Sequence, residues 1–241
     1  MKTLLVTIAI GEKYLQEYYM LFYNSQRNYA IKNGYDFKVI TDFLDKNNKY
    51  KTTISFNKIL VCNQEWSREY DFIVFVDADI LININSPPIH NYIDYGKNIG
   101  IVNEYSQPTK ERRIMIQKHM GWESSAKDYY KLSGFDIQTD MVLNSGVLVM
   151  QPKIHNELLI NIYNNYVETS RSHSRGYHYE QSCIGYELQK NKKFIILNNK
   201  FNSLWPIAKI DNKKTLQEYY NDNYFIHFAG KTDFHLIHFL E

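Results

Sequence analysis

Two aspartates, Asp77 and Asp79, stand one residue apart directly after an apolar run at positions 72–76. Two carboxylates this close together create a dense negative charge that is costly to leave uncompensated. Carboxylate oxygens are the ligands that Mg²⁺ and Mn²⁺ prefer, so we expect the pair to hold a divalent cation. In the alternative interpretation, one aspartate caps the following turn, the other is merely exposed, and no ion is needed.

The residues before Asp77 indicate how this pair is positioned. Five consecutive apolar residues are typical of a strand covered on both faces, as in a parallel sheet between helices. Strand-like and helix-like segments alternate from the first residue onward, which predicts an open α/β sheet. In such sheets the ligand crevice lies outside the carboxyl ends of the strands, which is where Asp77 and Asp79 would lie.

The remaining elements follow from periodicity and from helix start and stop signals. Gly34 supplies a stop for the first helix, and Pro87-Pro88 could start a short one. Positions 104–139 are predicted to be a long irregular insertion, which is often functional in an α/β domain. The pattern predicts strands at 3–10, 35–41, 72–76, 98–103, 141–150, 193–197 and 224–228, and helices near 15–30, 54–68, 124–132, 153–170 and 178–190.

Composition limits the partners. The 241 residues are 44% hydrophobic, enough for one sizeable core, and we expect a single domain over 1–241. Twenty-eight Lys and Arg against 26 Asp and Glu leave a net charge of +2, which argues against a nucleic-acid partner. The basic run at 110–113 is interpreted as a solvated face. The sequence leaves the oligomeric state open.

The expected location is the cytoplasm. Cys62 and Cys183 are the only cysteines and lack metal-ligand spacing, which favours a reducing compartment. The apolar stretch at 4–10 is short, is interrupted by Thr7 and has no clear cleavage site, so we interpret it as a strand rather than a signal peptide. No other stretch approaches the ~20 apolar residues of a membrane span.

A phosphatase of the haloacid-dehalogenase type, with Asp77 as nucleophile, is a second interpretation of the acidic pair. That motif normally places Thr or Val two residues past the second aspartate, where this chain has Leu81. It also usually opens its domain, whereas about 70 residues precede it here. The phosphatase is therefore disfavoured.

Five segments together resemble retaining glycosyltransferases, family 34 (galactosyl/xylosyltransferases) and more distantly family 8 (glycogenin-like). In chain order the matching segments read KNGYD at 32–36, SFNKIL at 55–60, VFVDADILI at 74–82, NSGVLVM at 144–150 and HFAGK at 227–231. The resemblance spans roughly residues 3–231. It implies a single-domain GT-A fold, a Rossmann-like arrangement with a mostly parallel central sheet flanked by helices.

The resemblance also implies a ligand set. The enzyme would move a sugar from a nucleoside diphosphate, most commonly UDP, to an acceptor hydroxyl with retention of configuration, using Mn²⁺ or Mg²⁺. The implied metal ligands are Asp77, Asp79 and His227. The implied donor contacts are Thr7, Ala9, Lys58, Asp77, Ala78, Asn144, Gly146, Gly230 and Lys231.

The residues themselves fit that chemistry. A divalent cation would stabilise charge developing on a diphosphate leaving group, and an imidazole ligand shifts the preference toward Mn²⁺. Gly230 would let the backbone approach phosphate, and Lys231 would offer it a point charge. Asn144 and Gly146 could grip sugar hydroxyls, although Asn-Ser-Gly also suits a plain turn.

Glu180 and Gln181 resemble the acidic-Gln segment of family 34 and are the candidate catalytic residues. Tyr179 stands where that family often has an acid. The alternative for Glu180 is a solvated helix start, where a negative charge is favourable. The acceptor is not identified by the sequence; aromatic positions in 104–139, including Trp122, Tyr129 and Tyr130, and the segment 202–206 with Trp205 are candidate acceptor walls or an oligomer contact. A non-catalytic nucleotide-sugar or carbohydrate-binding module on the same scaffold is the competing class.

Overall fold

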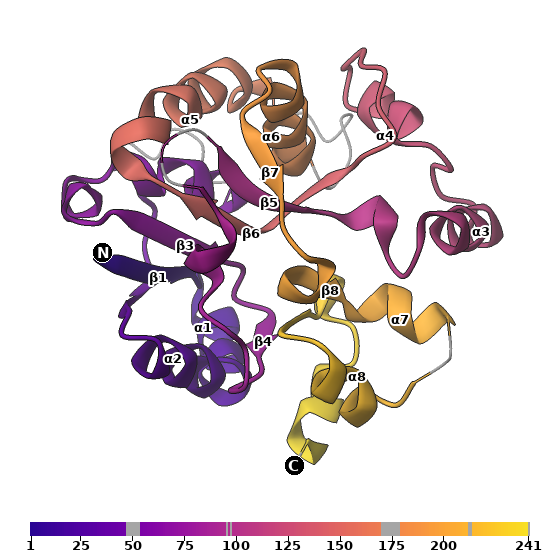
Figure 1. Ribbon diagram of the computed structural model, residues 1–241, viewed down its shortest axis with the longest axis horizontal. Coiled ribbons are helices and arrows are strands. Elements are labelled where there is room, and N and C mark those ends of the chain that lie inside the picture. The colour runs from indigo at the N-terminus through magenta and orange to yellow at the C-terminus, as the bar shows by residue number, and fades with distance from the viewer. Residues whose placement is uncertain (47–53, 95, 97, 170–178, 212–213, 241) are drawn as a thin grey trace.

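The computed structural model describes residues 1–46, 54–94, 96, 98–169, 179–211 and 214–240. A six-stranded sheet in the order β2-β1-β3-β6-β5-β7 forms its centre. The β1–β2, β1–β3 and β5–β7 pairs are parallel, whereas β6 runs antiparallel to β3 and β5. Figure 1 shows α5 and α6 on one side of this sheet and α1 and α2 on the other. The predicted α/β class with a mostly parallel sheet is confirmed.

The strands and helices have the following bounds. The strands are β1 Thr3–Ile8, β2 Asp36–Ile40, β3 Phe72–Val76, β4 Ile80–Ile82, β5 Ile99–Asn103, β6 Leu143–Met150, β7 Phe194–Ile196, β8 Ser203–Leu204 and β9 Phe225–His227. The α-helices are α1 Glu12–Leu21, α2 Tyr23–Lys32, α3 Lys110–Met120, α4 Ala126–Leu132, α5 Pro152–Tyr166, α6 Tyr179–Lys190, α7 Trp205–Asp211 and α8 Leu216–Asp222.

The 3-10 helices include η1 Ile54–Asn63, η2 Glu65–Glu69, η3 Ile89–Tyr92, η4 Glu104–Ser106, η7 Asn199–Asn202, η8 Ala229–Lys231 and η9 Phe234–Phe239. The helix predicted near 54–68 is therefore of the tighter 3-10 type. The single helix predicted from 15 to 30 is divided at Phe22, which ends α1 and begins α2. Gly34 follows α2 with a φ of 66°, a left-handed conformation that glycine adopts without strain.

The insertion at 104–139 is more regular than predicted, because it contains α3 as well as the expected α4. Thr109 caps the start of α3, its side chain accepting from the Arg112 amide, and Gly121 ends it in the left-handed region. The apolar positions of α3 are too few to show a helical period, which is why the pattern missed it.

A second, three-stranded sheet in the order β4-β9-β8 adjoins the central one. The chain passes from β3 in the first sheet to β4 in the second through only three residues, Asp77, Ala78 and Asp79. The backbone amide of Asp77 donates to Gly146 of β6, and that of Phe228 donates to Asp79. The acidic pair is thereby attached to both sheets.

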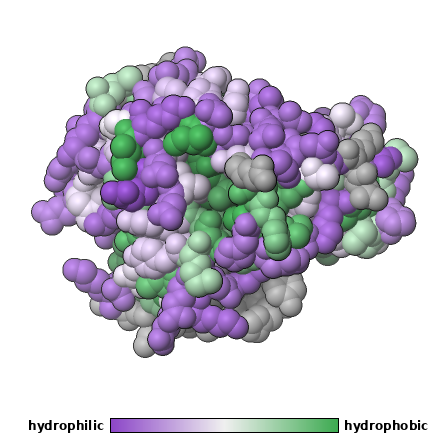
Figure 2. Space-filling model, turned by 90° about the horizontal axis from the view of Figure 1, so that it is seen from below, coloured by the Kyte–Doolittle hydropathy of each residue, from purple (hydrophilic) through white to green (hydrophobic). Residues whose placement is uncertain are grey.

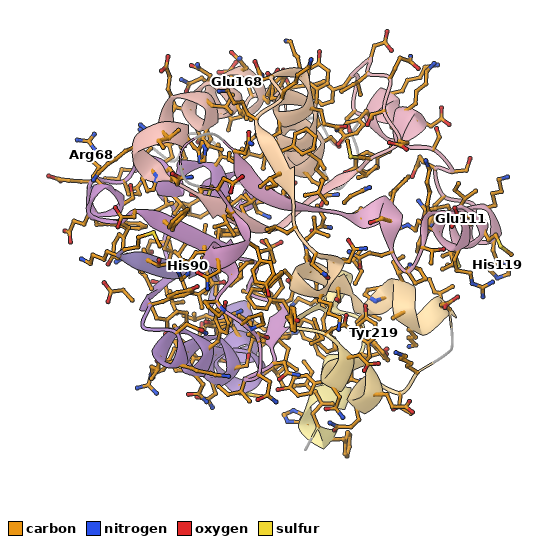
Figure 3. The ribbon with its side chains drawn as sticks, in the orientation of Figure 1. Arg68, His90, Glu111, His119, Glu168 and Tyr219 are labelled. Atoms are coloured by element: carbon orange, nitrogen blue, oxygen red, sulfur yellow. The ribbon has the colours of Figure 1, made fainter. Side chains whose placement is uncertain are left out.

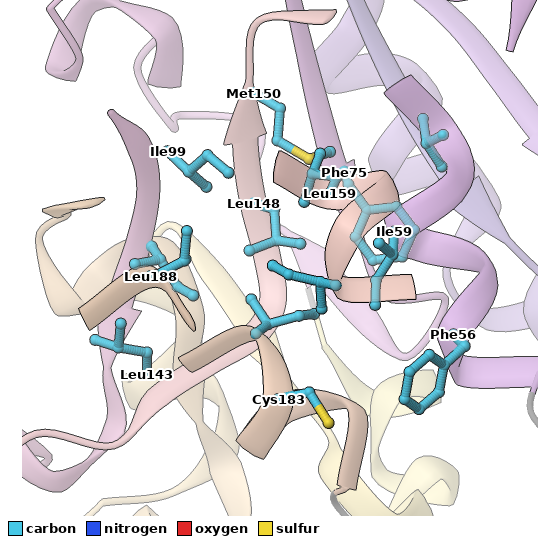
Figure 4. Close-up of a cluster of buried hydrophobic side chains, with 14 of the residues drawn as sticks. Phe56, Ile59, Phe75, Ile99, Leu143, Leu148, Met150, Leu159, Cys183 and Leu188 are labelled. Carbon is cyan, nitrogen blue, oxygen red and sulfur yellow. The ribbon is translucent and has the colours of Figure 1, made fainter. Parts of the chain in front are cut away.

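Alternate side chains of the central strands enter two cores, one on each face of the sheet. Ile73 and Phe75 of β3 belong to the core beneath α5 and α6, whereas Val74 and Val76 belong to the core on the opposite face. Figure 4 shows Phe75 and Leu148 among the side chains of the first core. Burial on both faces explains why β3 is apolar at every position, as the sequence predicted.

Apolar residues gather on one face of the molecule. The face formed by α1, α2, α8 and the C-terminal residues has hydrophobic residues in its middle with hydrophilic residues around them (Figure 2). These elements contribute the exposed side chains of Met20 and Phe239. In the part of the chain that the structure describes, no helix is long and apolar enough to cross a membrane.

Candidate active site

Asp77, Asp79 and His227 form a cluster at the junction of the two sheets. The three can each offer one ligand atom within 4.8 Å of the others. His227 Nε2 lies 3.3 Å from Asp79 Oδ1 and 4.0 Å from Asp77 Oδ2. His227 ends β9 and pairs with Ile80 of β4 in the second sheet. This pairing brings His227 next to Asp79, although the two are 148 positions apart in sequence. Two carboxylates and an imidazole are a suitable donor set for Mn²⁺ or Mg²⁺.

Lys58 lies behind the acidic pair. Its buried ammonium is 2.8 Å from Asp77 Oδ1 and 3.9 Å from Glu180 Oε1, and it also donates to the carbonyl and hydroxyl of Ser145. The side chain reaches there from η1, which packs against α5. One cation thus partly compensates the carboxylates of Asp77 and Glu180.

The metal-free cluster has perturbed protonation equilibria. Burial raises the pKa of Asp77 above its usual value, and the Lys58 ammonium only partly offsets this. Burial also disfavours ionisation of Asp79, but the charge of His227 and its hydrogen bond outweigh burial and lower the Asp79 pKa. Burial acts to lower the His227 pKa, yet the Asp79 carboxylate and its hydrogen bond raise it overall. A proton on His227 therefore does part of what a cation at this position would do.

Glu104, which the sequence did not single out, connects the predicted sugar-binding residues. Its Oε2 accepts from Asn144 Nδ2 at 2.7 Å and from Gln181 Nε2 at 3.2 Å, and its Oε1 accepts from the buried Arg113 at 3.1 Å. Gln181 Oε1 in turn accepts from the backbone amide of Ser145. One carboxylate therefore orients both amide side chains. No local signal marks Glu104, because its partners lie on β6, α6 and α3.

Gly146 lies directly under the imidazole of His227. A Cβ atom at this position would lie 2.5 Å from His227 Cε1 and 2.9 Å from Asn144 Oδ1. The bare backbone of Gly146 thus makes room for His227 and Asn144, a steric role distinct from the predicted contact with sugar hydroxyls.

A pocket of about 350 Å³ opens over these groups. It brings together seven of the predicted site residues, namely Asp77, Asp79, Asn144, Glu180, Gln181, His227 and Gly230. Its remaining walls are Glu104, Arg113, Trp122, Ser145, Leu204, Pro206, Ile207 and Ala229. Trp122, Leu204 and Pro206 belong to the candidate acceptor walls, and the other five were not predicted. A larger cavity of about 660 Å³ lies beside it between α3, α7 and α8, and shares Leu204 and Ile207 with it.

Six predicted donor contacts do not line the pocket. Two of them, Lys58 and Gly146, are described above, and the other four are Thr7, Ala9, Ala78 and Lys231. Thr7, Ala9 and Ala78 are buried, and Ala9 and Ala78 pack into the core that includes α1 and Phe228. Lys231 directs its ammonium to Glu17 Oε2 at 2.6 Å and over the ring of Tyr14. These side chains would have to move, or act through the backbone, to contact a nucleotide.

The candidate acceptor walls separate into two groups. Trp122 lines the pocket, and so does Pro206. Tyr129 lies next to Gln181, whose Nε2 donates to its hydroxyl, while Tyr130 is buried in the main core. Trp205 is also buried, and its indole nitrogen donates to Asp233, so it is a structural residue rather than a wall.

The basic run at 110–113 is only partly a solvated face. Lys110 pairs with Asp140 and Arg112 with Asp211, whereas Arg113 turns inward to Glu104. Figure 3 shows Glu111 and His119 on the outer side of the same helix. The three basic residues of the run are thus used in ion pairs.

Solved structures with the same fold are glycosyltransferases. A glycosyltransferase involved in the glycosylation of the major capsid of PBCV-1 matches with a TM-score of 0.63 at 12% identity, covering 100% of both chains. Galactosyltransferase LgtC, solved with donor and acceptor sugar analogues, matches with a TM-score of 0.55 at 12% identity over 94% of this chain and 87% of that one. Mouse xyloside xylosyltransferase 1 matches with a TM-score of 0.53 at 13% identity over 96% and 99% of the two chains. The fold is therefore the GT-A fold of glycosyltransferases.

The sequence assigns the family. The model of Glycosyl transferase family 8 matches residues 4–233. A comparison with curated protein sequences finds no significant match. The chain belongs to glycosyltransferase family 8, the more distant of the two families that its motifs resemble. It is accordingly a glycosyltransferase (EC 2.4) that transfers a sugar from a nucleotide sugar, and the phosphatase interpretation is excluded.

Proposed function

We propose that this enzyme is metal-dependent and transfers a sugar from a UDP-sugar to an acceptor hydroxyl, with retention of configuration. The observation that carries the proposal is the convergence of Asp77, Asp79 and His227 at one end of the pocket, with Lys58 behind them. UDP and retention rest on the resemblance of the motifs to retaining family members.

Asp77, Asp79 and His227 would hold the cation, and the mixed oxygen and nitrogen donors favour Mn²⁺ over Mg²⁺. When bound, the ion would neutralise the diphosphate as it leaves. Lys58 would keep Asp77 ionised and oriented while contributing a second positive charge to the same region. Gly230, with a φ of 72°, lies on the pocket wall, where its backbone can approach a phosphate closely.

Glu180 and Gln181 would contact the donor sugar. Both lie in the first turn of α6, line the pocket and are buried, so their side chains are held in place beside the proposed donor site. Gln181 is fixed by the amide of Ser145 and the carboxylate of Glu104, and Glu180 lies 3.9 Å from the Lys58 ammonium. We place them beside the sugar carbon at which positive charge develops.

The metal requirement is tested by donor hydrolysis with a panel of nucleotide sugars, with and without Mn²⁺. Asp79→Asn should reduce Mn²⁺-dependent turnover by about 10²-fold or more, because the ion is expected to supply several kcal/mol of transition-state stabilisation. Asp140→Asn, which removes a surface ion pair with Lys110, is the matched control. Equal activity of wild type in Mn²⁺ and in EDTA, or an active Asp79→Asn enzyme, would overturn the metal-dependent proposal.

The apolar side chains that line the pocket favour a carbohydrate acceptor. Trp122, about 41% exposed, and Pro206 offer apolar surfaces beside the polar groups of Glu104 and Arg113. A sugar ring can pack its C–H face on an indole while its hydroxyls reach such polar groups. We propose that the acceptor binds between these two residues.

Trp122→Ala should raise the acceptor KM about tenfold, roughly the loss of one aromatic contact, and leave donor hydrolysis in the absence of acceptor unchanged. Met120→Ala, at an equally exposed apolar residue outside the pocket, is the control. Once an acceptor is found, an unchanged KM in Trp122→Ala would rule out this wall.

A further inference from the structure

Asn202 is a buried side chain that touches the candidate metal ligand from behind. It ends η7 just before β8, is fully buried, and its Oδ1 lies 3.0 Å from His227 Nδ1. Its Nδ2 donates to Asn144 Oδ1 at 2.7 Å. An amide can be turned by 180° without changing its outline, so its orientation must be established from its neighbours.

A backbone group settles that orientation. The amide of Gly146 can only donate, and it donates to Asn144 Oδ1 at 2.9 Å. Asn144 Nδ2 is then left to donate to the carboxylate of Glu104, which can only accept when ionised. The positions of Oδ1 and Nδ2 of Asn144 are therefore assigned, because the Gly146 amide can only donate a hydrogen bond and the ionised Glu104 carboxylate can only accept one.

The assignment passes on through Asn202. Because Asn144 Oδ1 is an acceptor, Asn202 must present its NH₂ group to it, which turns Asn202 Oδ1 toward His227. A carbonyl oxygen accepts, so His227 Nδ1 must carry a proton. The Nε2 atom, on the side of Asp77 and Asp79, is then the one whose lone pair is available to a cation.

We infer that Asn202 is a positioning residue that fixes a proton on His227 Nδ1 and so directs Nε2 to the metal position. Histidine ligands commonly donate their second N–H to a polar partner, which sets the tautomer and the ring orientation. Here the partner is an amide, itself oriented through Asn144 by Gly146 and Glu104. Glu104 also orients Gln181, so the same hydrogen-bonded chain links the metal ligand to a proposed sugar contact.

This inference rests on the proposed metal site, but its first test needs no metal. In protein labelled with ¹⁵N-histidine, the Nδ1–H resonance of His227, identified by its loss in His227→Gln, should be visible and slow to exchange with solvent. Addition of diamagnetic Mg²⁺ should leave it in place. A wild-type His227 without a proton on Nδ1 would overturn the inference.

The second test measures Mn²⁺ affinity. Asn202→Leu, which keeps the size but removes the acceptor, should weaken Mn²⁺ binding by about 10–100-fold, the usual effect of losing such a partner, and should broaden the Nδ1–H resonance. Asn202→Ala removes the same acceptor without new bulk, and thermal unfolding reports whether each variant keeps its fold. Asn199→Ala is the matched control, because Asn199 lies in the same turn but bonds to Ser106.

Unchanged Mn²⁺ affinity in both folded Asn202 variants would also overturn the inference. A wild-type protein that shows the Nδ1–H resonance but binds no Mn²⁺ leads to a different conclusion. In that case the hydrogen-bonded chain stands and the proposed metal dependence fails.

Discussion

At the scale of single residues, the site depends on close contacts that leave no space for added atoms. Gly146 is the clearest case, since its missing side chain provides the space that His227 and Asn144 occupy. Replacing it by alanine keeps an allowed backbone but places a methyl group 2.7 Å from His227 Nδ1. The His227 imidazole and the Asn144 amide must then shift from their observed positions.

Gly146→Ala should therefore weaken Mn²⁺ binding by about 10-fold or more, comparable to the loss of a supporting hydrogen bond. Isothermal calorimetry on the metal-free protein measures this directly. Gly100→Ala serves as control, because the nearest atoms to its methyl group would belong to the side chains of Ile93 and Leu197. That variant should lose stability but keep Mn²⁺ affinity; the reverse pattern would contradict the steric role of Gly146.

The sequence allowed prediction of those site residues that are marked by their immediate neighbours in the chain. Asp77 and Asp79 were recognisable because they adjoin each other and an apolar strand. Glu104 and Asn202 were not, because their significance lies in hydrogen bonds to Asn144, 40 and 58 positions away. Lys231 was expected at a phosphate, but its ammonium pairs with Glu17, 214 positions earlier. The partner of a long side chain depends on which residues the fold places within its reach, and the sequence alone does not show these.

At the scale of elements, α6 presents Glu180 and Gln181, and its position depends on how closely it packs on α4. Gly185 lies in the middle of α6, and a Cβ atom there would lie 2.3 Å from the hydroxyl of Tyr130. In an open helix, alanine would be favoured over glycine by about 1 kcal/mol. Here overpacking should dominate, with a cost of about 1–3 kcal/mol.

Gly185→Ala should accordingly lower the free energy of unfolding and slow donor hydrolysis, while the same change in a Tyr130→Phe background should cost less. Urea unfolding of the two single variants and the double variant, compared with wild type, measures the coupling. Tyr130→Phe alone loses the hydrogen bonds from Gln189 Nε2 and from the Leu143 amide and provides the reference for their loss. If the effects of Gly185→Ala and Tyr130→Phe on the free energy of unfolding are strictly additive, the contact between Gly185 and Tyr130 is not the source of the cost.

The helices and strands differ in how clearly the sequence predicts them. β3 was predicted with its observed bounds because five apolar residues between polar ones are unambiguous. α3 was missed although Thr109 and Gly121 mark its ends, because its polar composition hides the period. The strands of the second sheet are two or three residues long, and the sequence predicted only the one that contains His227. Such short strands carry too few residues to show alternation.

At the scale of the whole molecule, the metal site couples folding, protonation and cation binding. The pKa of His227 is raised above its ordinary 6.5 in the folded, metal-free protein. Its pairing with Asp79 then adds stability that is fully present below pH 6.5 and is lost as the pH rises through the folded-state pKa. The lowered pKa of Asp79 adds no slope in this range, because that carboxyl is already ionised there.

A cation at His227 Nε2 must displace the proton, so Mn²⁺ affinity should rise with pH from about 6 upward and level off above the raised pKa of His227. The increase in Tm produced by Mn²⁺ should grow over the same range, because the metal-free protein loses stability while the bound form does not. Melting curves with and without Mn²⁺ between about pH 6 and 8.5 test this.

Calorimetry in two buffers of different ionisation enthalpy should show net proton release on Mn²⁺ binding below the raised pKa of His227. His227→Gln should bind Mn²⁺ weakly and with a flatter pH dependence; if wild-type affinity is flat or falls with pH, His227 does not exchange a proton for the ion.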